Sequence, residues 1–273
     1  RSASSETQNA WLSFSPVDRT WRIRDLGGYG ADRTEFVPSA QHSNSSPVYD
    51  HYRGQYLQVG GYSMGTNSNP NLIFDLQGNT GRCYYQEIVG WDARLVDIKR
   101  SLLVAVRTGR CMDLRTGEIK QPFKVTLPSY IGRNLALYDP KNDVYIYYCS
   151  ASKKKEALYV IDPKAGFKLQ KRPIPAEVLK SGIYDQLTID TRRGLIMSVG
   201  KFGETWIYDI GKDKWTQIPG AKFAKSPRTV NTQCGWNLAY AEDYDVFFLF
   251  AFKGKNPAGY GRYLMAMKYK PGG

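Results

Sequence analysis

Apolar and polar residues alternate along this chain in blocks of strand length, and one arrangement of blocks recurs five times. Each copy is an apolar strand that ends in an acidic residue, then a tight polar turn, then a second apolar strand. The copies lie at 47–61, 94–108, 136–150, 187–201 and 239–253. An aspartate at the end of a strand accepts hydrogen bonds from backbone N–H groups two residues on and so favours a tight turn. Each copy therefore predicts a β-hairpin.

The spacing of the acids indicates a repeat architecture. They are Asp50, Asp97, Asp139, Asp190 and Glu242, separated by 47, 42, 51 and 52 residues. A period of about 40–50 residues with several strands per unit is typical of a β-propeller. We therefore expect these five acids to occupy equivalent turns.

A second motif interleaves with the first. An apolar strand ends in another aspartate, a turn containing Gly or Lys follows, and a more amphipathic strand completes the pair. These aspartates are Asp75, Asp113, Asp162 and Asp209, and weaker copies of the motif lie at 10–26 and 263–273. The repeated unit is thus predicted to be four antiparallel strands, written as two hairpins. A single short helical turn is the only helix expected, at 175–181.

Some residues within the repeats match a known motif. They are Gly60 and Gly61 after a second strand, and Tyr208, Asp209, Trp215 and Pro219 in the unit that ends at 219. This pattern resembles the kelch and galactose-oxidase type of β-propeller. The resemblance covers nearly the whole chain as architecture, and it implies a fold that hosts enzymes and binding modules alike.

The two ends of the chain decide how the ring would close. The C-terminal copy lacks a fourth strand, and the N-terminal copy lacks a first and a second. The simplest prediction is an all-β propeller of five four-stranded blades, in which a strand at 20–26 completes the blade formed by 237–252 and 263–269. Residues 11–15 would then be an alternative third strand or an extra edge. A sixth blade of partial pieces, or a fragment of a larger propeller, is the alternative. The length of 273 residues agrees with one domain over 1–273.

The charge narrows the choice of partner. The net charge is +13, which serves solubility or attracts a polyanion such as an acidic polysaccharide, nucleic acid or a charged membrane surface. No nucleic-acid motif accompanies it, which disfavours nucleic acid. Many cations fall in predicted turns of one face, away from the usual ligand side, and predict that this face is positive. They are Arg53, Lys99, Arg100, Lys141, Arg192 and Arg193 in first turns, and Arg115, Lys164, Lys212 and Lys214 in second turns.

Metal and cofactor chemistry find little support in the sequence. The four cysteines lie in different units without CxxC spacing, and Cys149 reads as a buried thiol. The two histidines, His42 and His51, are predicted on opposite faces, which argues against a copper radical oxidase. We expect no cofactor and no metal.

No segment reaches 18 apolar residues, so no membrane span is expected. No signal peptide is visible at Arg1, and we expect a secreted, extracellular or periplasmic protein.

The repeat register predicts a ligand site at the mouth of the central channel. Five residues before each recurring acid stands a small polar residue, and six before stands a mostly larger one. The first set is Ser45, Asp92, Asn134, Asp185 and Asn237, and the second is Asn44, Trp91, Arg133, Tyr184 and Trp236. Aromatic rings suit sugar faces, and arginine binds carboxylate or sulfate through two hydrogen bonds. Alternatively, the polar residues cap strand starts and the tryptophans pack between blades.

Two carboxylates in this set allow catalysis to be considered. Asp92 and Asp185 fall in non-adjacent repeats, and this layout resembles that of five-bladed glycosidases, whose acids face each other across the channel mouth. Those enzymes add a third acid, and none stands in this ring. A polysaccharide lyase instead needs a charge neutraliser and a base. Candidates for these roles are Arg94 or Arg133 with His42, Tyr130 or Tyr184.

Two classes of function follow from these observations. The first is recognition or processing of a carbohydrate, with an acidic polysaccharide favoured by the charge. The second is a kelch-type scaffold that binds a protein through its loop face.

Overall fold

The computed structural model describes residues 10–15, 20–25, 48–50, 55–59, 71–75, 80–84, 93–125, 127, 134–149, 156–181, 187–200, 204–218, 237–256 and 259–269. The chain divides into two compact units, residues 1–124 and 125–273. Every sheet lies within one unit, and each unit is built from antiparallel sheets of consecutive strands.

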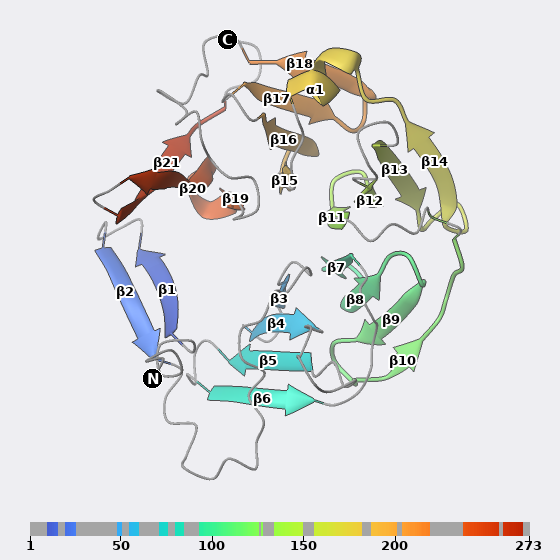
Figure 1. Ribbon diagram of the computed structural model, residues 1–273. Coiled ribbons are helices and arrows are strands. Elements are labelled where there is room, and N and C mark those ends of the chain that lie inside the picture. The colour runs from blue at the N-terminus through green and yellow to red at the C-terminus, as the bar shows by residue number, and fades with distance from the viewer. Residues whose placement is uncertain are drawn as a thin grey trace. The chain divides into compact units, whose positions relative to one another are not determined.

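The described residues of unit 1 form three sheets (Figure 1). A two-stranded sheet pairs β1 (Ala10–Ser15) with β2 (Thr20–Asp25). The second has the order β3 (Val48–Asp50), β4 (Gln55–Val59), β5 (Asn71–Asp75), β6 (Thr80–Tyr84). The third has the order β7 (Arg94–Asp97), β8 (Leu102–Ala105), β9 (Arg110–Asp113), β10 (Ile119–Lys120). Strands β3 and β7 contact each other, so consecutive four-stranded sheets meet through their first strands.

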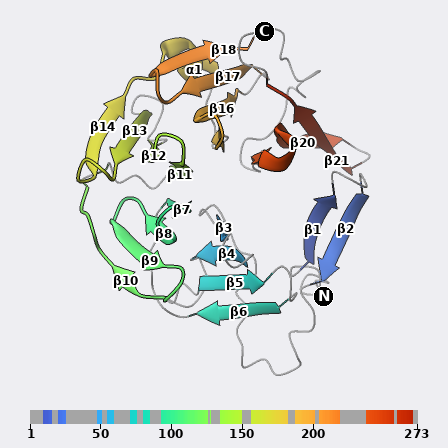
Figure 2. The same cartoon turned by 180° about the vertical axis from the view of Figure 1, so that it is seen from behind.

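Unit 2 also contains three sheets (Figure 2). The first runs β11 (Asn134–Asp139), β12 (Val144–Cys149), β13 (Ala157–Asp162), β14 (Lys168–Arg172), and helix α1 (Ala176–Ser181) follows it. The second runs β15 (Leu187–Asp190), β16 (Leu195–Val199), β17 (Thr205–Asp209), β18 (Lys214–Gln217). The third has three strands, β19 (Asn237–Ala241), β20 (Val246–Asn256) and β21 (Gly259–Met267), with the short 3-10 helix η1 (Glu242–Tyr244) between the first two. Strand β15 contacts both β11 and β19.

The middle sheet of unit 2, β15 to β18, buries both of its faces, which explains why its inner strands are continuous apolar blocks in the sequence. In β16, Ile196 belongs to the core shared with β12 and β13 of the preceding sheet. Its neighbours Leu195 and Met197 belong to the core shared with Phe247 of the following sheet. Strand β17 divides in the same way. Successive side chains of a strand point to opposite faces, so a sheet packed on both sides needs apolar residues at every position.

The four-stranded unit predicted from the two motifs is confirmed in four sheets, and the helical turn expected at 175–181 is α1. The N-terminal strands differ from the expectation. In the sheet order β2 pairs with β1, rather than completing the sheet of β19, β20 and β21. Only four residues separate 10–15 from 20–25 in the sequence, and closing a local hairpin costs less chain entropy than joining distant segments. The number of blades stays a prediction.

No helix among the described residues is both long enough and apolar enough to cross a membrane.

Candidate functional site

The strand-ending aspartates organise the first hairpin turns. Asp97 Oδ1 accepts hydrogen bonds from the backbone N–H groups of Lys99 and Arg100, each at 3.0 Å. Asp139 Oδ1 accepts one from the N–H of Lys141 at 2.9 Å. Both aspartates are fully buried. The recurring acid is therefore a structural element of each turn.

The second carboxylate oxygen of each acid binds the fourth residue of its turn. The pairs are Arg100 with Asp97 at 2.7 Å, Asn142 with Asp139 at 2.5 Å, and Arg193 with Asp190 at 2.5 Å. The residue after this one has a positive φ: it is Ser101, Asp143 or Gly194. Each turn thus combines a saturated carboxylate with one residue in the left-handed region, which small and Asx residues tolerate best.

A tyrosine–aspartate contact recurs at three turns and was not predicted. The tyrosine hydroxyl donates to an aspartate five residues later, which has a φ between 52° and 58°. The pairs are Tyr138 with Asp143 at 2.8 Å, Tyr208 with Asp213 at 2.6 Å, and Tyr240 with Asp245 at 3.0 Å. Burial, together with the hydrogen bond to Asp245, raises the pKa of Tyr240 to about 12. The available signal was the spacing YxxxxD in YDPKND, YDIGKD and YAEDYD.

Arg193 links the first turns of three consecutive sheets in unit 2. Lys141 Nζ donates to the Arg193 carbonyl oxygen at 2.8 Å. The Arg193 guanidinium binds both carboxylate oxygens of Asp245, at 2.5 and 2.7 Å, and it also binds Asp190. Next to it, Thr191 donates to Glu242 at 2.8 Å. The Arg193 guanidinium holds the pKa of the Asp245 carboxyl well below its usual range.

The last repeat is one residue out of the predicted register. Ala241 pairs with Val246, just as Asp190 pairs with Leu195, so Ala241 stands where the other turns have aspartate. The prediction of equivalence is wrong for Glu242, which begins η1, and the strand pairings confirm it for the other four acids. Tyr244 is the fourth residue of this turn. Because there is no carboxylate at 241 for it to bind, Tyr244 is left 45% exposed.

Most of the turn cations that predicted a positive face are engaged with acids. The ion pairs are Arg100 with Asp97, Arg115 with Asp113, Lys164 with Asp143, Arg192 with Glu242, Arg193 with Asp190 and Asp245, and Lys212 with Asp209. The hairpin turns are therefore less positive than the sequence predicted, because carboxylates of the same turn or of another turn lie beside most of their cations. Arg53 lies outside the described residues.

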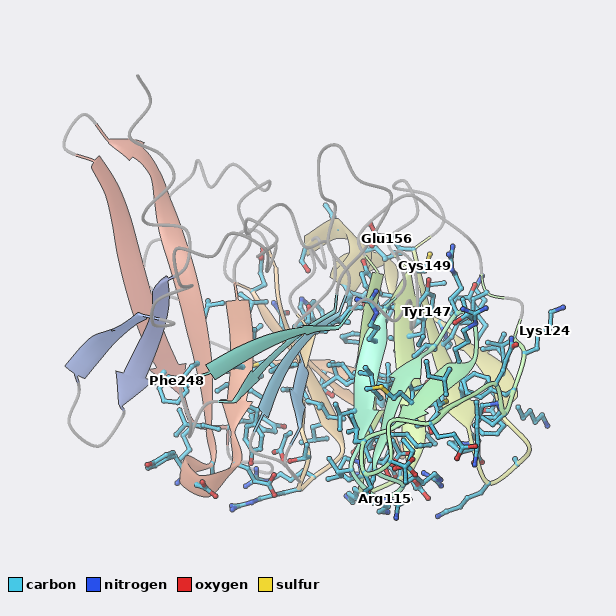
Figure 3. All side chains as sticks on the ribbon, turned by 90° about the horizontal axis from the view of Figure 1, so that it is seen from below. Arg115, Lys124, Tyr147, Cys149, Glu156 and Phe248 are labelled. Atoms are coloured by element: carbon cyan, nitrogen blue, oxygen red, sulfur yellow. The ribbon has the colours of Figure 1, made fainter. Side chains whose placement is uncertain are left out.

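Side chains with titratable groups also occur where β12 ends and β13 begins (Figure 3). Tyr147, Cys149 and Glu156 lie together there. The hydroxyl of Tyr148 donates to Glu156 Oε2 at 3.0 Å. Glu204 occupies the matching position in the next sheet, one residue before β17, as Glu156 does before β13. The sequence reasoning did not select these glutamates, although each directly precedes the apolar run of a third strand.

The predicted site residues are mostly beyond what the structure describes. Nine of them lie outside the described residues: His42, Asn44, Trp91, Asp92, Tyr130, Arg133, Tyr184, Asp185 and Trp236. Asn237 begins β19, and Arg94 begins β7 with its side chain buried at 2% exposure. The convergence of these residues at one channel mouth therefore stays a prediction.

The thiols in the described part of the chain are sequestered. Cys111 and Cys149 are buried, which confirms the buried thiol expected at Cys149. Burial, and to a lesser extent the nearby charge of Asp97, raises the pKa of Cys111 to about 12. No cluster of three or more His, Cys, Asp or Glu side chains suited to a metal occurs among the residues described.

Comparison with known proteins identifies the fold. Over 95% of its length the chain is similar to TolB from Acinetobacter baumannii, with a TM-score of 0.54 and 15% identity. Over 90% it is similar to a structural-genomics protein of unknown function from Bacteroides thetaiotaomicron VPI-5482, with a TM-score of 0.55 and 11% identity. The fold is an all-β propeller. The chain spans 60% and 65% of those two structures. No family model matches the chain, so the kelch resemblance gains no support. No curated protein matches it either.

Proposed function

We propose that this propeller binds an acidic polysaccharide. The observation that carries the proposal is the imbalance of exposed charge: among the described residues, exposed Lys and Arg side chains outnumber exposed Asp and Glu. The exposed acids are Glu118, Glu177, Asp213, Glu242 and Asp243. Three strand-ending aspartates are instead buried in their turns. A surface of this kind attracts extended polyanions through long-range electrostatics.

The proposed recognition site is the channel mouth predicted from the repeat register. There Trp91, Tyr184 and Trp236 would stack on sugar rings, and Arg133 would bind a carboxylate or sulfate. Asn44 and Asn237 would add hydrogen bonds to hydroxyl groups. If the protein also turns the polysaccharide over, Asp92 and Asp185 would act as the acids of a glycoside hydrolase. In a lyase, Arg133 would neutralise charge and His42 or Tyr130 would supply the base, whereas Arg94, at 2% exposure, is too buried to meet a polymer.

A glycan array, followed by calorimetry on the best acidic and neutral binders, tests the proposal. We expect Arg133→Ala to weaken the acidic glycan about tenfold and the neutral one less, with added salt reducing the difference. Equal binding of both glycans by wild type and variant would contradict the acidic preference. Reducing ends and the absorbance of unsaturated uronate report turnover, and its loss in Asp92→Asn or Asp185→Asn with retained binding would identify an enzyme.

A protein-binding scaffold is the second candidate, and one observation favours it. Tyr244 stands exposed on a turn whose backbone is held in place by the contacts of Arg193, Asp245 and Tyr240. Exposed tyrosines on rigid supports are frequent anchors of protein interfaces. A photoreactive amino acid at position 244 should cross-link one protein from an extract of the source cells. The same group at 119, the other large exposed apolar position described, is the control. Equal cross-linking at both positions would contradict a specific interface.

We also propose an extracellular or periplasmic location, since acidic polysaccharides are encountered there. Fractionation of the source cells tests this.

A further inference from the structure

We propose that the outer strands of two neighbouring sheets in unit 2 form the surface along which an acidic polysaccharide lies. This inference rests on the proposed function and adds a second contact surface for the polysaccharide, separate from the proposed channel-mouth site. The surface consists of four exposed lysines, called here the lysine band: Lys168, Lys171, Lys212 and Lys214.

Two neighbouring sheets contribute to the lysine band, and one ion pair links them at this surface. Lys168 and Lys171 lie on β14, the outer strand of its sheet. Lys214 begins β18, the outer strand of the next sheet. Arg172 Nη1 binds Asp213 Oδ2 at 2.8 Å, which joins β14 to the turn before β18. Lys212 and Lys214 flank Asp213 in sequence. On β14, Lys168 projects from the same face as Arg172 and Lys171 from the opposite face, because successive side chains of a strand alternate. The lysine band therefore follows both sides of the β14 edge and the turn that Arg172 joins to it.

The acids in this region are already occupied. Asp213 accepts hydrogen bonds from Arg172 and from the hydroxyl of Tyr208. Asp162, which pairs with Lys168 across the strands, accepts from two backbone N–H groups of its own turn. Lys212 contacts Asp209 at 3.3 Å, but its side chain is 78% exposed, so that pair is weak in water. Arg172 and Asp213 cancel each other, and the four lysines stand against two carboxylates, those of Asp162 and Asp209, so the lysine band carries a local excess of positive charge.

Protection of sheet edges accounts for part of this pattern only. Lysines on an outer strand prevent edge-to-edge pairing with other chains, and this explains Lys168 and Lys171. It does not explain Lys212, which lies in a turn. Its charge instead extends the band from β14 to the start of β18, as a polymer with repeated negative charges requires.

The composition of the lysine band favours a polysaccharide over nucleic acid. Proteins that bind single-stranded nucleic acid combine cations with aromatic side chains on which bases stack. Of the residues described, the large exposed apolar side chains are Ile119 and Tyr244, and neither belongs to the band. The band's arginine is engaged by Asp213 and Gln170. Lysines on flexible stems can reach the repeated carboxylates or sulfates of a sugar polymer as point charges, without the fixed geometry that an arginine fork imposes.

Binding of polygalacturonate by the full chain, titrated at two salt concentrations, tests the inference. Lys168→Gln/Lys214→Gln should lower the affinity about tenfold and flatten its salt dependence, because two ionic contacts are lost. Lys99→Gln/Lys124→Gln removes the same charge from exposed positions of unit 1 and should change the affinity less than about twofold. Thermal unfolding of each variant checks that it is folded.

The outcomes separate this inference from the proposed function. If both double variants lose affinity equally, the lysine band is not the surface, whereas polysaccharide binding stands. If wild type binds neither polygalacturonate nor a sulfated polysaccharide, the proposed function fails and the inference with it. If a single-stranded oligonucleotide binds more tightly than polygalacturonate, and the band variant alone loses it, the band is a nucleic-acid surface and the polysaccharide assignment is overturned.

Discussion

At the scale of single residues, Arg193 makes the most consequential contacts in the described part of the chain. Its guanidinium binds Asp190 and Asp245 and is 29% exposed. Arg193→Ala should lower the free energy of unfolding by about 1–2 kcal/mol, since charge-assisted hydrogen bonds are lost at a partly buried site. Arg192→Ala is the matched control, because Arg192 contacts Glu242 only at 3.8 Å and is 47% exposed. Urea unfolding of both variants should show a clear difference; equal losses would contradict the assigned role of Arg193.

Tyr240 predicts a dependence on alkaline pH. Its pKa is raised to about 12 in the folded protein, against about 10 in an unfolded chain. The stability that this group contributes is therefore complete below about pH 10 and is lost as the pH rises toward 12. Tyr240→Phe should be less stable than wild type at pH 8, and the difference should shrink between pH 10 and 12. Tyr244→Phe, in the same turn, is the control. A constant difference across this range, measured by urea unfolding, would exclude the mechanism.

At the scale of elements, two glycines with the same φ allow two free-energy costs to be distinguished. One is the cost of a left-handed backbone, and the other is the cost of a steric clash between sheets. Gly166 and Gly194 both have a φ of +66°. A Cβ at Gly166 meets nothing within 4 Å, whereas one at Gly194 comes within 2.6 Å of Asn142 Nδ2 and 3.0 Å of Asp139 Oδ2. Gly166→Ala should cost about 1 kcal/mol from the left-handed conformation alone, and Gly194→Ala about 1–2 kcal/mol more. Equal costs in equilibrium unfolding would show that the turns of the two sheets are not in close contact.

The hairpins were predictable because their signals are local. A strand-ending aspartate and a short polar turn specify each hairpin without reference to the rest of the chain, and this holds for Asp97, Asp139 and Asp190. The error at Glu242 has the same origin, because an acid one position late resembles the motif in sequence. Only the pairing of Ala241 with Val246 reveals the shift. The Arg193 contacts join residues about 50 positions apart, and a single sequence carries no signal for such a pairing.

The site was less predictable than the fold. The register of the repeats predicted ten residues at the starts of strands. A position in the repeat does not say which side chain contacts a ligand. The positive turn face failed for a physical reason: the carboxylates that shape each turn also neutralise its cations, as Arg100 and Asp97 show. Charge counted along the sequence therefore overstated the charge of the turns, and the excess is found on outer strands such as β14 instead.

At the scale of the whole molecule, the net charge of +13 and the turn carboxylates predict sensitivity to acid. Arg193 lowers the pKa of Asp245, and Arg115, mainly through its side-chain hydrogen bonds, lowers that of Asp113. A carboxyl whose pKa is depressed on folding contributes stability above the pKa of the unfolded chain, about 4, and loses it as the pH falls further. Protonation also raises the net positive charge and adds repulsion. Melting temperature should therefore fall steeply below about pH 4.

Asp245→Asn isolates the contribution of one such carboxylate to this acid response. The variant should melt below wild type at pH 7, because Arg193 loses an ionic partner. The difference in melting temperature should shrink as the pH falls below about 4, because Asp245 is protonated there in the unfolded wild type while the folded state keeps its carboxylate charged, so that unfolding of wild type takes up a proton. Added salt should raise the melting temperature of both proteins at pH 3 by screening repulsion, without separating them again. Melting curves that stay parallel from pH 7 to pH 3 would mean that Asp245 contributes through its shape and hydrogen bonds alone.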